Sequence, residues 1–236
     1  MVSNIDYAVD KQIFKFLLSN QINFNSMSIS KTIENISNNP NIYNGDIVAG
    51  SLLIHETRKI AALLLKDVDG KAWKKAIEID NILQKRSPAS AIRQARLIKN
   101  RLTLMTPELW KLIKEGNSDI AVQAILAASI KHSSLLGDFM DKILREHWLT
   151  FNYKISAKDW NDYLETCVQI DPKVSEWKAS TISKLRQVVF RILAEAKYID
   201  NTRTLKLLPV SVVPELRHYL TKNSEDYILK CMEVTQ

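Results

Sequence analysis

Apolar side chains recur every three to four residues along most of the chain after residue 46, which predicts a series of amphipathic helices. Ser87-Pro88 and Thr106-Pro107 each place a capping residue before a proline, a pattern typical of helix starts. Helices are predicted at 46–66, 71–84, 88–105, 107–116, from 118 onward, 134–149, 156–170, 180–196, and as a final pair from 213. The predicted fold class is therefore all-α, a mainly helical bundle.

Three stretches interrupt this helical pattern. Residues 1–46 combine a short apolar repeat with an Asn-rich loop and predict an N-terminal arm, which either packs on the body or binds a partner. The segment 150–155 (TFNYKI) alternates apolar and polar residues, as a short strand or an extended crossing would. It separates a basic helical bundle at 47–150 from a C-terminal helical subdomain at 151–236. Residues 198–208 place a polar turn between short apolar segments and predict one small β-hairpin.

The C-terminal subdomain has two candidate architectures. Helix, helix and hairpin follow one another from 156 to 208, which is the order of elements in a winged helix-turn-helix. An ordinary helical subdomain with one hairpin has the same pattern, so the sequence leaves both architectures open.

Charge changes this picture, because the surplus of positive charge is concentrated in one segment. Residues 71–101 hold nine basic and two acidic side chains, a surplus of seven that equals the net charge of +7 for the whole chain. The remaining residues are electrically balanced. A surplus gathered in one segment can produce a local positive field, whereas an evenly spread surplus mainly aids solubility.

The predicted helix at 88–105 has one apolar and one basic side. At 100° per residue, the apolar side chains fall on the face that would pack inward (Ala91, Ile92, Ala95, Ile98 and Leu102). The opposite face is predicted to carry the cations Arg86, Arg93, Arg96 and Arg101, with Lys99 at its margin and Lys85 just before it. Arginines arranged in this way suit phosphate groups, because a guanidinium donates several hydrogen bonds and stays charged. A solvated helix face with local ion pairs would have the same pattern.

A second candidate surface lies on the predicted helix at 180–196. Lys184, Gln187 and Arg191 share a side opposite the apolar residues of that helix, and Arg203 falls in the polar turn that follows. In a winged helix-turn-helix these side chains would face a DNA groove, with Arg203 on the wing. A plain packing helix is the alternative interpretation.

Enzyme signatures are missing from the sequence. It holds no glycine-rich phosphate loop, dinucleotide-binding motif, serine-hydrolase elbow or zinc-protease motif. The four histidines are scattered, and Cys167 and Cys231 match neither a disulfide framework nor a metal motif. We therefore predict a non-enzymatic protein that uses no cofactor, metal or small-molecule substrate.

Membrane association is not expected either. No stretch reaches the ~18–20 apolar residues that a bilayer span requires. The N-terminus also lacks the basic start and long apolar run of a signal peptide. The expected location is the cytoplasm, where both cysteines would be reduced.

The order of several short motifs resembles the BrxA family, the small non-enzymatic component of bacterial BREX phage-resistance systems. Over residues 47–220 the matching motifs are GSLL at 50–53, ETRKIA at 56–61, NILQ at 81–84, SPASA at 87–91, DF at 138–139, and KLRQ at 184–187. The resemblance implies an all-helical body similar to the NusB antitermination fold, affinity for DNA, and work alongside larger BREX proteins with methyltransferase and ATPase activities. The chain departs from the family in its long first 46 residues and in lacking the glycine that members often have near Ala196-Lys197.

Residues and resemblance together lead to two functional hypotheses. In the first, the chain is a nucleic-acid-binding accessory protein of a BREX system, with double-stranded DNA as the expected partner and RNA as the alternative. In the second, it is a protein-interaction module whose basic helix docks on a larger acidic defence subunit.

Overall fold

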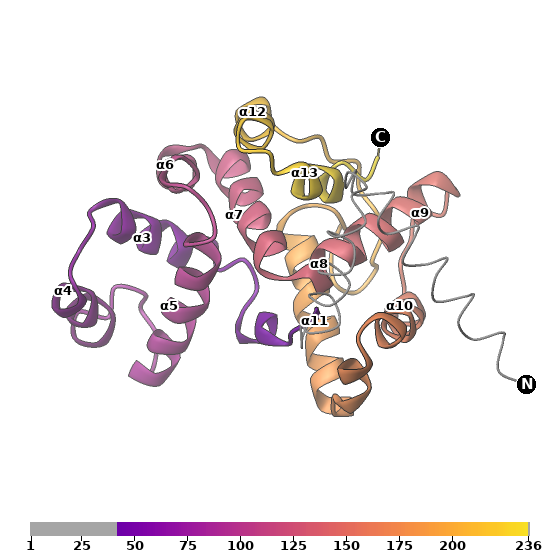
Figure 1. Cartoon of the computed structure of the whole chain (residues 1–236), viewed down its shortest axis with the longest axis horizontal. Helices are drawn as coiled ribbons and strands as arrows, with labels where there is room; N and C mark the ends of the chain where they lie inside the picture. The colour runs from indigo at the N-terminus through magenta and orange to yellow at the C-terminus, as the bar shows by residue number, and fades with distance from the viewer. Residues whose placement is uncertain (1–41, 236) are drawn as a thin grey trace, which may run out of the picture. The chain divides into compact units, whose positions relative to one another are not determined.

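The computed structural model describes residues 42–235 (Figure 1). The predicted N-terminal arm at 1–46 lies almost entirely outside the described residues, and its helix stays a prediction. The described part begins with a 3-10 turn, η1 (Asp46–Ala49), which buries Ile47. Nearby, the backbone N–H of Tyr43 donates to the buried Asp171 carboxylate at 3.1 Å, so the start of the described chain is tied to a residue far along the sequence.

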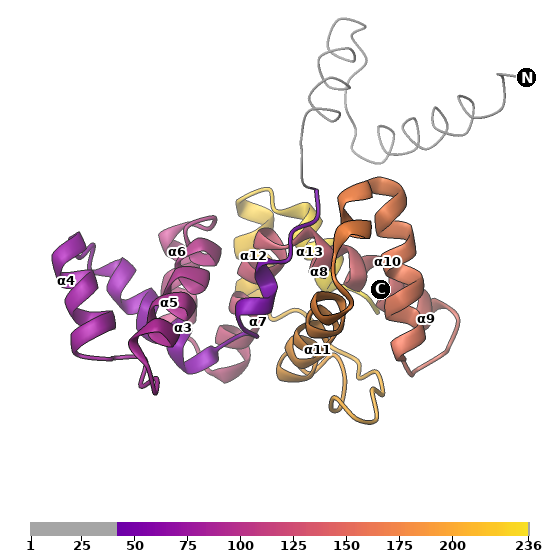
Figure 2. The same cartoon turned by 90° about the horizontal axis from the view of Figure 1, so that it is seen from below.

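The first group of helices comprises α3 (Ile54–Leu65), α4 (Gly70–Lys74), the π-helical turn η2 (Lys75–Ile79), α5 (Pro88–Leu102) and α6 (Pro107–Glu115). Figure 2 shows α3 close to α5 and α6, and all three pack against α7 (Ser118–His132). Residues 121–130 of α7 are all buried, because neighbouring helices surround it on every side. This continuous burial explains why α7 has no polar face.

The second group follows α7 without a long loop. The helices α8 (Ser134–Asp138), η3 (π-helical, Phe139–Leu144) and α9 (Arg145–Leu149) form one uninterrupted stretch, as the pattern at 134–149 predicts. It leads to α10 (Ala157–Ile170), the 3-10 turn η4 (Pro172–Glu176) and α11 (Ala179–Glu195). The final helical pair is α12 (Pro214–Lys222) and α13 (Asp226–Met232), also as predicted.

The all-α fold class is confirmed, since the described residues contain helices and no β-strand. The predicted hairpin at 198–208 is reduced to a single antiparallel bridge between Ile199 and Leu207. A second bridge joins Lys154 to Lys206, so the segment at 150–155 is an extended crossing rather than a strand. The division of the chain near residue 150 stays a prediction.

One helix prediction is wrong: residues 46–66 do not form a continuous helix. The chain leaves helical geometry after η1 and re-enters it at α3, with Leu53 in the left-handed region at φ 53°. In this break, two side chains from other helices form hydrogen bonds with the backbone carbonyl and N–H groups that no longer have helical partners. Arg101 of α5 donates to the carbonyls of Gly50 and Ser51, and the Glu195 carboxylate accepts from the Leu52 backbone N–H at 2.9 Å. Tertiary partners thus replace the helical hydrogen bonds that the local pattern favours.

The helix predicted at 71–84 is also too long, because it ends at Ile79. Beyond it, Asn81 adopts a left-handed conformation, and its side-chain amide makes two hydrogen bonds to the backbone of Lys85. An asparagine side chain that bonds its own loop competes with helical continuation. The short loop formed in this way connects η2 to the start of α5.

Candidate nucleic-acid interface

Helix α5 is the best-defined part of the candidate interface, and its local sequence explains its position. The Ser87 hydroxyl accepts from the Ser90 backbone N–H, and Pro88 occupies the first helical turn. The inward side is anchored by the predicted residues Ala91, Ala95, Ile98 and Leu102, which are buried. Leu97 is buried as well, although it was not predicted, and the predicted Ile92 is half-buried against the core. A helix anchored in this way holds its opposite face in a fixed orientation.

Arg93 and Arg96 project from that opposite face and are exposed. Within the described residues neither guanidinium has a hydrogen bond or an ion pair. Arg86 is likewise exposed and without a side-chain partner there. Their donors are therefore available to an external anion.

Lys99 connects this face to helix α4. Its ammonium lies 4.6 Å from the ring centroid of Trp73, a cation–π contact that keeps the charge at the surface. Lys71 and Lys74 on α4 are also exposed and lack an ion pair in the described structure, whereas Lys75 pairs with Asp80 at 2.8 Å. The name α5 face is used below for the exposed cations of α4, of α5 and of the loop just before α5; they are Lys71, Lys74, Arg86, Arg93, Arg96 and Lys99.

Two predicted members of the face are placed differently. Lys85 forms an ion pair with Glu56 of α3, and both side chains are half-buried. Burial raises the pKa of Glu56, but the hydrogen bond and charge of Lys85, together with a backbone hydrogen bond and the nearby His55, leave the pKa below its usual value. Lys85 therefore ties the loop between η2 and α5 to α3, and its charge is already compensated.

Arg101 does not project outward, which corrects the sequence prediction. Only 2% of the residue is exposed, and its guanidinium donates to the carbonyls of Ser51 at 2.6 Å and Gly50 at 3.0 Å. Burial lowers the pKa of Arg101 to about 10, while the nearby Glu195 carboxylate acts to raise it. The side chain is thus a charged internal support for the chain break before α3 and cannot reach a phosphate at the surface.

The second candidate surface lies on α11. Its buried side consists of Leu185, Val188, Val189, Phe190, Ile192 and Leu193, which leaves Lys184, Gln187 and Arg191 exposed, as the helical spacing predicts. Arg203 is exposed on the following turn, where its backbone N–H donates to the Asn201 side chain at 2.8 Å. The structure therefore places all four at the surface, on α11 and the turn that follows it.

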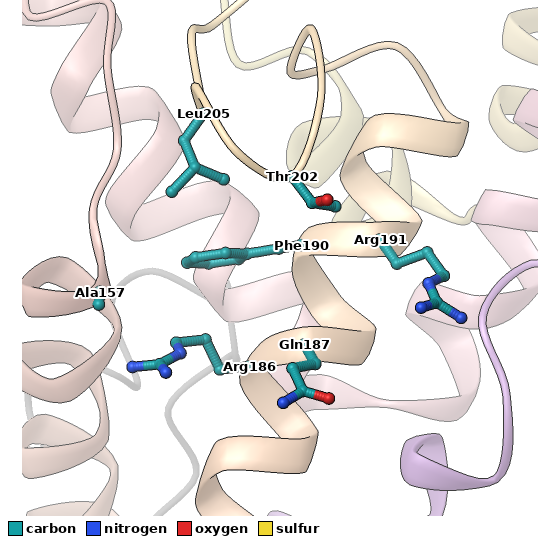
Figure 3. Close-up of a pocket in the computed structure, with 7 residues that line it drawn as sticks. All are labelled: Ala157, Arg186, Gln187, Phe190, Arg191, Thr202 and Leu205. Atoms are coloured by element: carbon teal, nitrogen blue, oxygen red, sulfur yellow. The ribbon is translucent and has the colours of Figure 1, made fainter.

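A cavity of about 390 Å³ brings some of these residues together with others that the sequence did not indicate (Figure 3). Gln187 and Arg191 line it, whereas Lys184 and Arg203 do not. The additional lining residues come from α11, the start of α10 and the turn at 202–205; they are Ala157, Arg186, Phe190, Thr202 and Leu205. Arg186 was missed because its position on the helical wheel lies close to the apolar side.

Other chemistry is limited within residues 42–235. No group of three or more His, Cys, Asp or Glu side chains is placed to hold a metal ion there. Burial raises the pKa of the Cys167 thiol to about 11 and that of Cys231 to about 12, so neither thiol is activated. In the same range no single helix is long and apolar enough to cross a membrane. The helix α7 and the 134–149 stretch reach that length and apolar composition only when taken together, and the two are bent by 110° relative to each other.

Fold and surface define the class of protein: within residues 42–235 it is all-helical, and exposed arginines on two of its helices have no side-chain partner there. Comparison with known proteins then identifies the family. The BrxA family model matches residues 41–224, and the chain belongs to the BrxA family.

The relatives support this assignment. The chain is 44% identical to "BREX protein BrxA" of Paramagnetospirillum magneticum (strain ATCC 700264 / AMB-1), over 82% of this chain and 97% of that protein. It is 32% identical to "BREX protein BrxA" of Escherichia coli O9:H4 (strain HS), over 80% and 89% of the two chains. The described fold is similar to the crystal structure of an uncharacterized protein from Magnetospirillum magneticum, with a TM-score of 0.75, 43% identity, and coverage of 81% of this chain and 98% of that one.

Proposed function

We propose that this chain is a non-enzymatic accessory protein of a BREX phage-defence system that binds double-stranded DNA in the cytoplasm. The observation that carries the proposal is the pair Arg93 and Arg96, which are exposed, have no partner among the described residues, and lie on a helix whose other side is buried. The names of the relatives, BREX protein BrxA, support the system to which the protein belongs and other BREX proteins as its partners.

The chemistry of the α5 face suits phosphates rather than base edges. Arginine and lysine side chains on one surface neutralise backbone phosphates and release counterions, which drives binding that weakens with salt. Phosphate contacts orient a protein on the duplex but carry no sequence information. The expected activity is therefore duplex binding with weak sequence preference, and RNA is the alternative ligand for the same cations.

The first prediction tests the α5 face directly. Arg93→Glu combined with Arg96→Glu should weaken the mobility shift of a duplex by at least ~10-fold, since two attractive charges become repulsive. The matched control reverses two exposed lysines of α6, Lys111→Glu with Lys114→Glu, and changes the net charge by the same amount. Circular dichroism should show the helicity of both variants unchanged.

Three outcomes would count against the proposal. An unchanged shift in the α5 variant would reject the α5 face as the binding surface. Equal weakening in both variants would show that only net charge matters. A wild-type protein that shifts neither duplex DNA nor RNA at ~50 mM salt would favour the alternative function, docking of the basic helix on an acidic surface of another BREX protein.

A further inference from the structure

The segment that joins α9 to α10 (Figure 2) brings three aromatic side chains together. The ring centroids of Trp148 and Tyr153 lie 4.9 Å apart, and those of Phe151 and Tyr153 lie 6.5 Å apart with an angle of 85° between the rings. We call these three residues the aromatic turn. Phe151 is 77% exposed and Tyr153 is 41% exposed, so the outer part of the group is open to solvent. An exposed aromatic ring can pack against another flat, conjugated group.

Phe151 costs the fold stability without an evident return inside the described chain. Its φ of 57° is a left-handed conformation that is strained for a bulky side chain, and its ring gains little from burial. The Phe151 N–H donates to the Trp148 carbonyl at 3.2 Å, and the Asn152 N–H donates to the His147 carbonyl at 2.8 Å. This is a Schellman motif, in which glycine usually takes the position of Phe151. The helix end thus explains the conformation but not the residue, which points to a partner outside the chain.

Two lysines face each other next to the aromatic turn. Lys154 and Lys206 are partners in an antiparallel bridge whose two hydrogen bonds, 3.1 and 2.9 Å long, lie on either side of the pair. In such a non-hydrogen-bonded pair the side chains share one face, with Cβ atoms roughly 4.5–5.5 Å apart, and like charges repel. Both lysines are exposed, and within residues 42–235 neither ammonium has a hydrogen bond or an ion pair. We call them the lysine pair.

The nearest carboxylate offsets only part of this charge. The pKa of Asp200 is lowered mainly by the hydrogen bond from Thr204, with a smaller contribution from the Lys206 charge. Asp200 also accepts from the backbone N–H groups of Asn201 and Lys206, so its oxygens are already engaged. Residues 147–155 include no acidic side chain. An external anion near the two ammonium groups would therefore relieve their repulsion.

The same bridge positions both the lysine pair and the aromatic turn. The Leu207 N–H donates to the Tyr153 carbonyl at 2.9 Å, and Lys154 follows Tyr153 directly. Sites for single-stranded nucleic acids combine these components, because bases stack on exposed rings while cations contact the phosphates. A duplex exposes only the edges of its bases in the grooves, so its base faces cannot reach the rings. A single strand supplies both groups in every nucleotide, a free base face and an anion beside it.

We propose that the aromatic turn and the lysine pair bind an unpaired stretch of a nucleic-acid strand. A base stacks on Phe151, and adjoining phosphates lie at Lys154 and Lys206. The site goes beyond the α5 face, because it uses different residues and reads the presence of free bases. It does not depend on duplex binding by Arg93 and Arg96, so the two proposals can fail separately.

Fluorescence anisotropy tests the site on the full chain with labelled oligothymidine and oligouridine, each compared with an abasic strand of the same length. Phosphate contacts act on strands with and without bases, so the ratio of affinities reports on base contacts. The wild-type protein should bind at least one of the strands with bases more tightly than the abasic strand. Phe151→Ala should weaken that binding by at least ~5-fold and leave the abasic strand unchanged, since stacking is lost and the lysines remain.

The matched control for the ring is Leu149→Ala, because Leu149 is 68% exposed in the same segment but is not aromatic. This variant should keep the wild-type preference for bases. Phe151→Trp should keep it as well, since a ring remains. Phe151→Asn introduces a residue that tolerates the left-handed conformation, so it should lose the preference while staying folded, as a thermal melt would show.

The lysine pair has its own test. Lys154→Gln with Lys206→Gln should weaken strands with and without bases by the same factor, at least ~5-fold at low salt, because phosphate contacts are lost. Lys111→Gln with Lys173→Gln removes two exposed charges on α6 and η4 and should leave both affinities unchanged. The Arg93→Glu/Arg96→Glu protein should retain the preference for bases, which distinguishes this site from the α5 face.

The proposal is overturned if the wild-type protein binds neither oligothymidine nor oligouridine more tightly than the abasic strand. It is also overturned if the folded Phe151→Ala protein keeps the preference for bases. Equal losses in Leu149→Ala and Phe151→Ala would overturn it too, because the surface would then act through apolar area alone, as a protein-docking patch does.

Discussion

At the scale of single residues, α5 shows that helical spacing distinguishes an inward from an outward side but does not identify every exception. Arg93 and Arg96 are exposed as predicted, yet Arg101 is buried against the carbonyls of Gly50 and Ser51. The acceptors lie fifty and fifty-one positions earlier in the chain, in a segment whose local pattern favours a helix. Only the tertiary structure shows that the helix is interrupted in this segment and that its free carbonyl groups accept hydrogen bonds from Arg101.

The buried position of Arg101 leads to a stability prediction. Arg101→Met should lower the free energy of unfolding by about 3–5 kcal/mol, because it leaves the buried Ser51 carbonyl and the part-buried Gly50 carbonyl without this donor and the Glu195 carboxylate without its nearby cation. Arg93→Met on the same helix is the matched control, and a change within about 0.5 kcal/mol is expected for this exposed, unpaired residue. Urea denaturation measures both. Equal stability of the two variants would show that Arg101 is not a structural support.

At the scale of elements, most helix starts were predictable because they depend on local residues. Ser87 and Ser156 cap α5 and α10 through hydrogen bonds to nearby backbone amides, so their effect is visible in a short window of sequence. The end of α11 is harder to predict. The N–H groups of Lys197 and Tyr198 donate to the carbonyls of Ala194 and Leu193, a Schellman motif that a glycine usually completes.

Lys197 occupies the glycine position of this motif at φ 64°, which is strained for a side chain with a Cβ. Lys197→Gly should therefore raise the free energy of unfolding by up to about 1 kcal/mol. The lost ion pair with Asp119 offsets little of this gain, because the two side chains are 70% and 61% exposed. Lys197→Ala keeps the strain and removes the same ion pair, so it is the control. If urea denaturation finds the glycine variant no more stable than the alanine variant, the strain is not significant.

At the scale of the whole molecule, the fold class followed from sequence because repeated apolar spacing determines which side of each helix is buried. The α5 face could also be predicted in outline, since its cations are close together in sequence. The cavity on α11 could not. Its walls come from α10, α11 and the turn at 202–205, which are brought together only by tertiary packing. The bridge between Lys154 and Lys206 lies in the segments that lead to these walls, and it has no signal in local sequence.

Whether the α5 face and the cavity contact one duplex is a question about the whole molecule, and salt dependence can answer it. Each phosphate contact contributes about 0.9 to the slope of log affinity against log salt. Arg93→Gln with Arg96→Gln should therefore reduce that slope by roughly 1.8. If the cavity engages the same duplex, Arg186→Gln with Arg191→Gln should reduce the slope by a similar amount, and the fourfold variant by roughly 3.6.

The neutral control, Lys111→Gln with Lys173→Gln, should leave the slope unchanged, because these exposed lysines belong to neither surface. A slope that responds to the α5 variant but not to the cavity variant would assign the duplex contacts to the α5 face alone. A slope that responds to neither would contradict phosphate contact at both surfaces. The slope of the fourfold variant decides between these outcomes. If both surfaces contact one duplex independently, its reduction in slope must equal the sum of the reductions in the two double variants.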